Sequence, residues 1–201
     1  MREEIHPAPA RGSIAFAVCG SFCTLNAALE QAQRLVRQGW ELLPVMSGTV
    51  AALDTRFGRA EDWKTRLEAI CGRPVRDTLQ EAEPLGPKGL ARALVIAPCT
   101  GSTLARLAAG LSDTPVTMAA KSLLRVGCPV VIAVSTNDGL GGSGENIARL
   151  MQRKHFYFVP YGQDDCVHKP QSLKAHLELV PAALDAALQE QQLQPVLREW
   201  K

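Results

Sequence analysis

Short apolar runs alternate along this chain with segments of helical periodicity, and this alternation restricts the possible folds more than any other feature. The runs at 14–18, 93–97 and 130–134 contain no alternating polar positions, which is typical of strands buried on both faces. The segment 25–38 carries apolar residues at helical spacing. Solid apolar strands separated by helices predict an α/β protein with a mostly parallel sheet covered on both faces.

Further segments fit the same pattern. Strands are expected at 42–46 and 156–159, and Pro44 places the first of them near a sheet edge, because proline cannot donate a ladder hydrogen bond. The Pro/Gly-rich stretch 77–90 predicts an ordered loop or lid. Helices are predicted at 60–70, 103–109, 116–125, 145–154 and, bent near Pro181, 172–191.

The length and charge of the chain limit its organisation. Its 201 residues, 46% of them hydrophobic, suit a single domain over 1–201. We expect the core to span about 12–192, with short N-terminal and C-terminal tails. The formal net charge is only +2 and no basic block is present, which argues against nucleic-acid binding.

The cysteines and the apolar runs bear on the compartment. None of the six cysteines has C-x-x-C spacing, so no metal site is predicted and each cysteine is interpreted as a small core residue. Residues 1–11 contain no apolar signal segment, and the longest apolar run, 128–134, is too short to span a bilayer. We therefore expect a cytoplasmic protein with reduced thiols and no membrane anchor.

Small and hydroxyl-bearing residues follow four of the expected strands, at 19–24, 47–49, 98–103 and 135–139. In open α/β folds the carboxyl ends of the strands form the edge where ligands bind. Small residues let backbone N–H groups approach an anion, hydroxyls add donors, and each following helix presents the positive end of its dipole. Together these four segments, which we call the hydroxyl-rich corners, predict an anion or nucleotide site. Each corner alone is also typical of a turn or helix cap. The glycine-rich segment 139–144 lacks the P-loop lysine and is interpreted as a flexible connection or lid.

Two sets of motifs carry a resemblance to known proteins. The Gly20-Ser21 turn and the run Pro-Cys-Thr-Gly-Ser-Thr-Leu-Ala at 98–105 resemble the flavoprotein superfamily, which includes the flavin-dependent cysteine decarboxylases and the flavin prenyltransferases. Further stretches resemble the dipicolinate synthase family within that superfamily, and the likeness runs over about 12–197. These stretches lie at 54–58, 82–88, 118–121, 133–138 and 157–164.

The resemblance implies a flavodoxin-like three-layer fold, an FMN site between protomers, and a homo-oligomer that is a trimer or a multiple of trimers. Members of the dipicolinate synthase family act with an A subunit that carries a nicotinamide-nucleotide-binding domain, which we expect to hold NADP. The resemblance therefore implies one component of an oxidoreductase. It would help to oxidise a dihydrodipicolinate-type precursor to dipicolinate during sporulation, in the cytoplasm of the mother cell of a spore-forming bacterium.

Candidate binding residues follow from the resemblance and from the chemistry of the expected ligands. The candidate cofactor-binding residues are Gly20, Ser21, Ser47, Thr100, Gly101, Ser102, Thr103, Ser135 and Asn137. A dicarboxylate calls for fixed cations and hydrogen-bond donors. The candidate substrate-binding residues are therefore Arg56, Lys88 and Lys121, together with Asp138, which could orient a ring nitrogen.

The chain departs from its superfamily at the positions that carry catalysis. The stretch 83–86 (Glu-Pro-Leu-Gly) stands in the region of the cysteine decarboxylases' catalytic histidine, and Ser135-Thr136 stands where flavin prenyltransferases have an arginine. No histidine is placed to activate Cys19 or Cys99, so no catalytic residue is assigned. Three roles stay open: a subunit that completes an oxidation site, a non-catalytic protein for assembly or substrate holding, and a self-sufficient FMN-dependent oxidoreductase.

Overall fold

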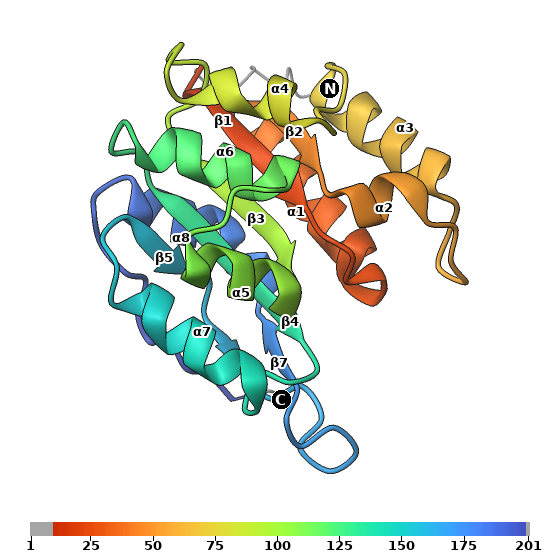
Figure 1. The fold of residues 1–201 in the computed structure, drawn as a ribbon, viewed down its shortest axis with the longest axis vertical. Helices are drawn as coiled ribbons and strands as arrows, with labels where there is room; N and C mark the ends of the chain where they lie inside the picture. Colours follow the sequence, from red (N-terminus) through yellow and green to blue (C-terminus); the bar gives the residue numbers. More distant parts are fainter. Residues whose placement is uncertain (1–9, 200–201) are drawn as a thin grey trace, which may run out of the picture.

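A seven-stranded sheet lies at the centre of the computed structural model, which describes residues 10–199 (Figure 1). The predictions for residues 1–9 and 200–201 lie outside the described part. The strands are β1 Gly12–Val18, β2 Trp40–Met46, β3 Leu94–Cys99, β4 Val130–Thr136, β5 Phe156–Phe158, β6 Tyr161–Gly162 and β7 Leu173–Ala175. They run in the order β2-β1-β3-β4-β7-β6, and β5 also pairs with β4.

The sheet is mostly parallel, as the alternation of strands and helices predicts. β1 pairs in parallel with β2 and β3, and β4 pairs in parallel with β3 and β5. The exceptions are β7, which is antiparallel to β4, and β6, which is antiparallel to β7. These short antiparallel strands lie beside the carboxyl end of β4, where β7 pairs with Ser135 and Thr136.

Helices flank the sheet on both faces. They are α1 Leu25–Arg37, α2 Gly48–Ala52, α3 Ala60–Cys71, α4 Leu79–Ala82, α5 Gly101–Ala109, α6 Pro115–Leu124, α7 Gly142–Met151 and α8 Val180–Ala187, with 3-10 helices η1 Phe22–Thr24, η2 Glu83–Leu85 and η3 Leu177–Leu179. In Figure 1, α4, α5, α6 and α7 lie in front of the sheet and α1 and α8 lie behind it. The predicted helices before residue 155 are confirmed, with ends shifted by up to three residues.

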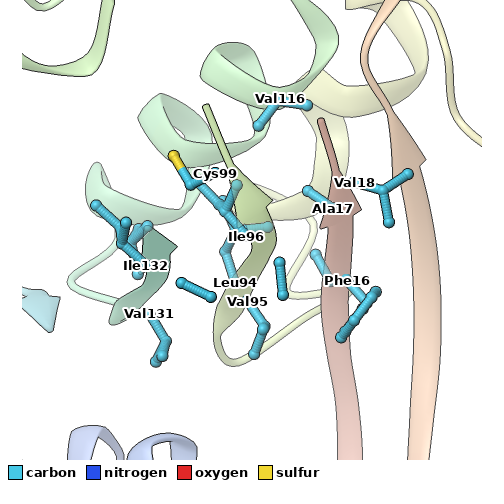
Figure 2. Packing of buried hydrophobic residues seen from close by; sticks show 14 of the residues in the cluster. Phe16, Ala17, Val18, Leu94, Val95, Ile96, Cys99, Val116, Val131 and Ile132 are labelled. Atoms are coloured by element: carbon cyan, nitrogen blue, oxygen red, sulfur yellow. The ribbon is translucent and has the colours of Figure 1, made fainter. Parts of the chain in front are cut away.

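The apolar runs form the core between the helical layers. Phe16, Ile96 and Ile132, on the three central strands, are fully buried. Figure 2 shows the side chains of these strands next to one another, with Val116 reaching them from α6. Continuous apolar sequence on β1, β3 and β4 is therefore explained by helices on both sides of the sheet.

Pro44 lies in the edge strand β2, as its chemistry predicts. Its carbonyl accepts a hydrogen bond from the N–H of Arg76 at 2.9 Å, on the side of β2 that faces away from β1. Because the N–H and C=O of one strand residue point to the same side, the missing N–H of Pro44 removes no bond to β1.

The stretch 77–90 is not a lid. Thr78 and Glu81 form a capping box that starts α4, and η2 follows directly. The N–H of Gly86 donates to Ser122 Oγ of α6 at 3.3 Å, and a Cβ at Gly86 would lie 1.9 Å from the Ser122 carbonyl oxygen. Backbone packed this closely against a helix holds the segment in place, so its proline and glycine content marks tight packing rather than mobility.

The long helix predicted at 172–191 is wrong. The segment begins with strand β7, continues through η3, and becomes helical only at α8. Pro181 lies in the first turn of α8, where its missing N–H needs no intrahelical partner, so it starts the helix instead of bending it. Pairing of β7 with the end of β4 overrides the helical spacing of the sequence.

No helix in the described residues 10–199 is both long and apolar enough to cross a membrane.

Candidate functional site

Three of the four hydroxyl-rich corners meet at one cavity of about 780 Å³ at the carboxyl edge of the sheet. The corner after β1, the corner after β3 and the corner after β4 all contribute to its wall. The candidate cofactor residues that line it are Gly20, Ser21, Thr100, Gly101, Ser102, Ser135 and Asn137. Of the candidate substrate residues, Arg56 and Asp138 line the same cavity.

Three hydroxyl groups, which we call the hydroxyl corner, join the loop after β1 to the end of β4: Ser21, Thr24 and Ser135. The Ser21 and Ser135 Oγ atoms are 2.7 Å apart, and Thr24 Oγ1 lies 3.3 Å from Ser135 Oγ. Thr24 Oγ1 also donates to the Ser21 carbonyl at 2.9 Å. Because each hydroxyl is both donor and acceptor, this corner can turn a donor towards an anion in the cavity.

The first turn of α5 forms the next part of the wall. Thr100 caps the helix by accepting the N–H of Thr103 at 3.4 Å. The amides of Gly101 and Ser102, in the same turn, have no acceptor inside the helix and lie at the positive end of its dipole. Thr103 itself does not line the cavity, because its hydroxyl donates to Cys19 Sγ at 3.3 Å in the interior.

Asp138 is held as a carboxylate beside this turn. The hydroxyls of Thr136 and Ser143 donate to its Oδ1 at 2.5 and 2.8 Å, and these bonds lower the pKa of Asp138. A Cβ at Gly101 would lie 2.6 Å from Ser143 Oγ and 2.7 Å from Thr136 Oγ1. Glycine at position 101 therefore lets the start of α5 approach the loop after β4.

The fourth corner, at 47–49, does not line the cavity but packs against the Gly20 turn. Ser47 does not line the cavity but is the N-cap residue of α2, and its N–H donates to the Val18 carbonyl at 3.0 Å. A Cβ at Gly20 would lie 2.9 Å from Cγ2 of Thr49. The start of α2 thus fixes the Gly20 turn and does not itself face the cavity.

Two candidate substrate residues lie elsewhere. Lys121 is exposed on α6, and its Nζ contacts Ser112 Oγ at 3.3 Å. Lys88 is exposed in the turn that follows η2. Neither lines the cavity, because the helical layer in front of the sheet and not the carboxyl edge carries both residues.

The second wall of the cavity comes from the C-terminal part of the chain. Asp164, Lys169, Ser172, Leu173 and Lys174 line it, from the segment that ends in β7. Sequence reasoning missed both lysines, because Lys174 lies in the segment predicted as a helix from 172 and Lys169 lies in the loop before it. The available signal was the Leu-Lys-Ala run itself, which is compatible with a short strand but too short to be distinguished by periodicity.

Aromatic and thiol groups complete the wall. Phe22, Cys23 and Phe57 line the cavity, and the Arg56 guanidinium lies 4.9 Å from the Phe57 ring centroid. Cys19, in contrast, is buried, and burial raises its pKa to about 11.

The other cysteines differ in burial, and the histidines of the described residues lie away from the cavity. Burial also raises the pKa of Cys99. Cys23 and Cys166 are exposed, so the interpretation of every cysteine as a core residue is wrong for these two. Among the described residues, no histidine lines the cavity, and no three His, Cys, Asp or Glu side chains gather as metal ligands would.

The fold and the cavity together define a class of protein, a flavodoxin-like α/β sheet with a hydroxyl-rich cavity at its carboxyl edge. Comparison with known protein families and structures identifies the same class. The model of the Flavoprotein family matches residues 8–180, and the chain belongs to this family. It is 44% identical to the B subunit of dipicolinate synthase from Bacillus subtilis over 186 residues, which are 92% of this chain and 93% of the relative.

Solved structures extend the comparison. The crystal structure of the dipicolinate synthase B subunit from Bacillus halodurans matches with a TM-score of 0.88 and 43% identity, over 96% of this chain and 100% of the other. Burkholderia xenovorans DmrB in complex with FMN, described as a cubic protein cage for redox transfer, matches with a TM-score of 0.64 and 22% identity, over 89% of this chain and 96% of the other. The second likeness bears on the fold alone.

Proposed function

We propose that this chain acts as the B subunit of a dipicolinate synthase. Its cavity would hold a phosphate-bearing flavin, FMN, and the dicarboxylate substrate, while a partner A subunit supplies NADP. The observation that carries this proposal is the meeting of three hydroxyl-rich corners beside cationic side chains in one cavity. The 44% identity to a dipicolinate synthase B subunit supports it, because the identity extends over nearly the whole chain.

The residues of the cavity fit a phosphate-bearing ring compound. The hydroxyl corner and the amides of Gly101 and Ser102 offer the donors that a phosphate needs. Phe22 and Phe57 offer flat apolar surfaces for a ring. FMN, when bound, supplies the capacity to accept and pass on two electrons with a proton.

The proposed reaction converts a dihydropyridine dicarboxylate to dipicolinate. The ring loses one hydride and one proton and becomes aromatic, and the hydride reduces the NADP that the partner holds. This chain would contribute by orienting the ring and by excluding water with its aromatic wall. Orientation of this kind can lower a barrier by several kcal/mol, up to about 7–11 kcal/mol in ideal cases.

The test is a product assay with the two purified proteins. Dipicolinate formation by the A subunit is measured with and without this chain, and then with Ser102→Ala and Arg56→Ala. We expect omission to abolish formation and each variant to lower kcat/KM about tenfold or more, because Ser102→Ala removes a hydroxyl donor from the cavity wall and Arg56→Ala removes a cation from it. Lys154→Ala, an exposed lysine outside the cavity, is the control and should keep the rate of the unchanged chain.

The outcomes separate the three roles. Full synthesis by the partner in the absence of this chain would overturn the proposal. Synthesis that needs this chain but is unchanged by both cavity variants would indicate a role in assembly. Synthesis by this chain and FMN without the partner would indicate a self-sufficient oxidoreductase.

The proposal includes the setting of the protein. We place it in the cytoplasm of the mother cell during sporulation, as a homo-oligomer that is a trimer or a multiple of trimers. The mass of the purified chain in solution tests it, and a monomer at working concentration would contradict it.

A further inference from the structure

The cavity has two chemically different walls. One wall contains the hydroxyl corner and the start of α5, which suit a phosphate. The other wall, which we call the lysine wall, comes from the segment that leads into β7, and it carries two of the three cations that line the cavity, Lys169 and Lys174. In Figure 1 this segment is the blue loop at the bottom of the molecule, and β7 continues from it beside β4.

Pairing in the sheet sets the place of Lys174. In the antiparallel pair of β4 and β7, Lys174 lies directly opposite Ser135. Residues opposite each other across such a pair have Cβ atoms about 4.5–5.5 Å apart on the same face. Ser135 Oγ is 2.7 Å from Ser21 Oγ, so the half-buried stem of Lys174 starts beside the hydroxyl corner.

The other neighbour of Lys174 in the sheet is small. On β6, the residue opposite Lys174 is Gly162, which has no side chain. Lys169 lies further out on the exposed loop. Both lysines line the cavity, Lys174 from the half-buried strand β7 and Lys169 from the exposed loop before it.

The charged groups of the cavity wall give it a small excess of positive charge, which favours an anion. Three cations, Arg56, Lys169 and Lys174, face two carboxylates, Asp138 and Asp164. Asp138 already accepts two hydroxyl hydrogen bonds, which hold its charge. With a phosphate held by the hydroxyl corner and the start of α5, the lysine wall would bind a second anionic group.

We propose that Lys174, with Lys169 on the exposed loop, binds a carboxylate of the substrate and sets the preference of the cavity for ring dicarboxylates over ring monocarboxylates. This inference rests on the proposed function and names the residues that recognise the substrate in the same cavity. An ammonium group suits this task because it is a compact charge with three donors that can follow a carboxylate as the ring moves.

The experiment compares two ring acids on the FMN-loaded chain. Pyridine-2,6-dicarboxylate and pyridine-2-carboxylate are titrated by calorimetry into the unchanged chain, Lys174→Gln, Lys169→Gln and the control Lys154→Gln. We expect Lys174→Gln to lose about tenfold or more in dicarboxylate affinity, Lys169→Gln to lose less, and the monocarboxylate affinity to change little. FMN affinity should be unchanged in all variants.

A kinetic measurement with the partner A subunit gives a second readout. Lys174→Gln should raise KM for the precursor with a smaller change in kcat, because the lysine binds the substrate and takes no part in hydride transfer. If Lys174→Gln also loses FMN affinity, dicarboxylate binding is measured on Lys174→Arg, which keeps the positive charge. Retention of dicarboxylate binding by the arginine variant supports the inference, and equal loss overturns it.

Failure of the inference can be separated from failure of the proposed function. Dicarboxylate that binds the unchanged chain and Lys174→Gln equally well overturns the role of Lys174 and leaves the proposed function standing. An unchanged chain that binds no dicarboxylate and adds nothing to synthesis by its partner overturns the proposed function, and this inference with it.

Discussion

Gly101 shows how much a single residue decides at this site. Its lack of a side chain lets the first turn of α5 approach the hydroxyls of Thr136 and Ser143. A larger residue would force either the first turn of α5 or the hydroxyls of Thr136 and Ser143 to move. The geometry of the proposed phosphate site, formed by the hydroxyl corner and the start of α5, therefore depends on a residue that has no side chain.

The substitution Gly101→Ala tests this dependence. We expect FMN affinity to fall by about tenfold or more, and the free energy of unfolding to fall by about 1–3 kcal/mol, because the new methyl group overpacks the corner. Fluorescence titration of FMN and urea unfolding measure the two effects.

The control for this substitution is Gly48→Ala. A Cβ at Gly48, in the first turn of α2, meets no atom within 4 Å. Alanine there should leave FMN affinity unchanged and stabilise the chain by about 0.4–1 kcal/mol through loss of unfolded-state freedom. Equal FMN affinity in Gly101→Ala and Gly48→Ala would contradict the role of Gly101.

Asp138 gives a prediction for pH. Hydrogen bonds from Thr136 and Ser143 lower its pKa below the ordinary value of 3.8. Such a group stabilises the folded state fully above its unfolded pKa, and this contribution is lost as the pH falls through its folded pKa. The difference in free energy of unfolding between the unchanged chain and Asp138→Asn should therefore be constant near neutral pH and shrink below 3.8.

Urea unfolding of both proteins from about pH 7 to about pH 3 measures this difference. Gly48→Ala, outside the cavity and with no atom within 4 Å of the added Cβ, controls for the general effect of acid on the fold. A difference for Asp138→Asn that stays constant through the acid range would contradict the assignment.

At the scale of elements, α4 and η2 are part of the fixed framework. Their proline and glycine residues look like a loop in sequence, yet Gly86 is packed against the backbone of α6 and Leu85 is fully buried. We therefore expect this segment to contribute to stability and not to ligand entry.

The substitution Leu85→Ala should lower the free energy of unfolding by about 2–5 kcal/mol, because it leaves a cavity in the core. Leu79→Ala, in the same segment but with a 36% exposed side chain, should cost under about 1 kcal/mol. Urea unfolding compares the two. Equal, small losses would mean that the segment opens readily, as a lid would.

β7 shows the opposite case, in which an element that looks helical becomes a strand. Its pairing with Ser135 and Thr136 places Lys174 at the cavity and completes the second wall. The tail after α8 also packs: Gln192 bonds the Phe158 backbone through both ends of its amide, each at 2.7 Å. Both arrangements depend on partners distant in sequence, which local periodicity does not contain.

At the scale of the whole molecule, a ligand that binds only the folded state should stabilise it. FMN at about 100 times its Kd should add about 2.7 kcal/mol, which corresponds to a rise in Tm of about 5–10 °C for a chain of this size. Riboflavin, which lacks the phosphate, should give a much smaller rise in Tm, because the hydroxyl corner and the start of α5 would have no anion to bind.

Thermal unfolding with each ligand measures these shifts, and Gly101→Ala serves as the variant whose response to FMN should be reduced. Equal Tm shifts from FMN and riboflavin would contradict a phosphate site at the hydroxyl corner and the start of α5. No shift from either ligand would contradict a flavin site in this chain.

Most of the framework could be predicted from the sequence. Uninterrupted apolar runs such as 14–18 and 130–134 indicate strands buried on both faces, and their alternation with helical segments favours a parallel sheet between helical layers. The positions of the small and hydroxyl residues after those strands follow from the same topology, because the carboxyl ends of parallel strands share one edge.

Which residues face the cavity was decided only in three dimensions. Lys121 and Lys88 have the right charge but lie in the layer of helices, whereas Lys174 reaches the cavity because a short strand pairs with the end of β4. The sequence by itself determined the class of fold and the chemistry of its corners, since burial and turn formation are local requirements. The tertiary structure determined which of the charged candidates reach the cavity and added the lysines of its second wall, since the position of a side chain depends on contacts between segments far apart in the chain.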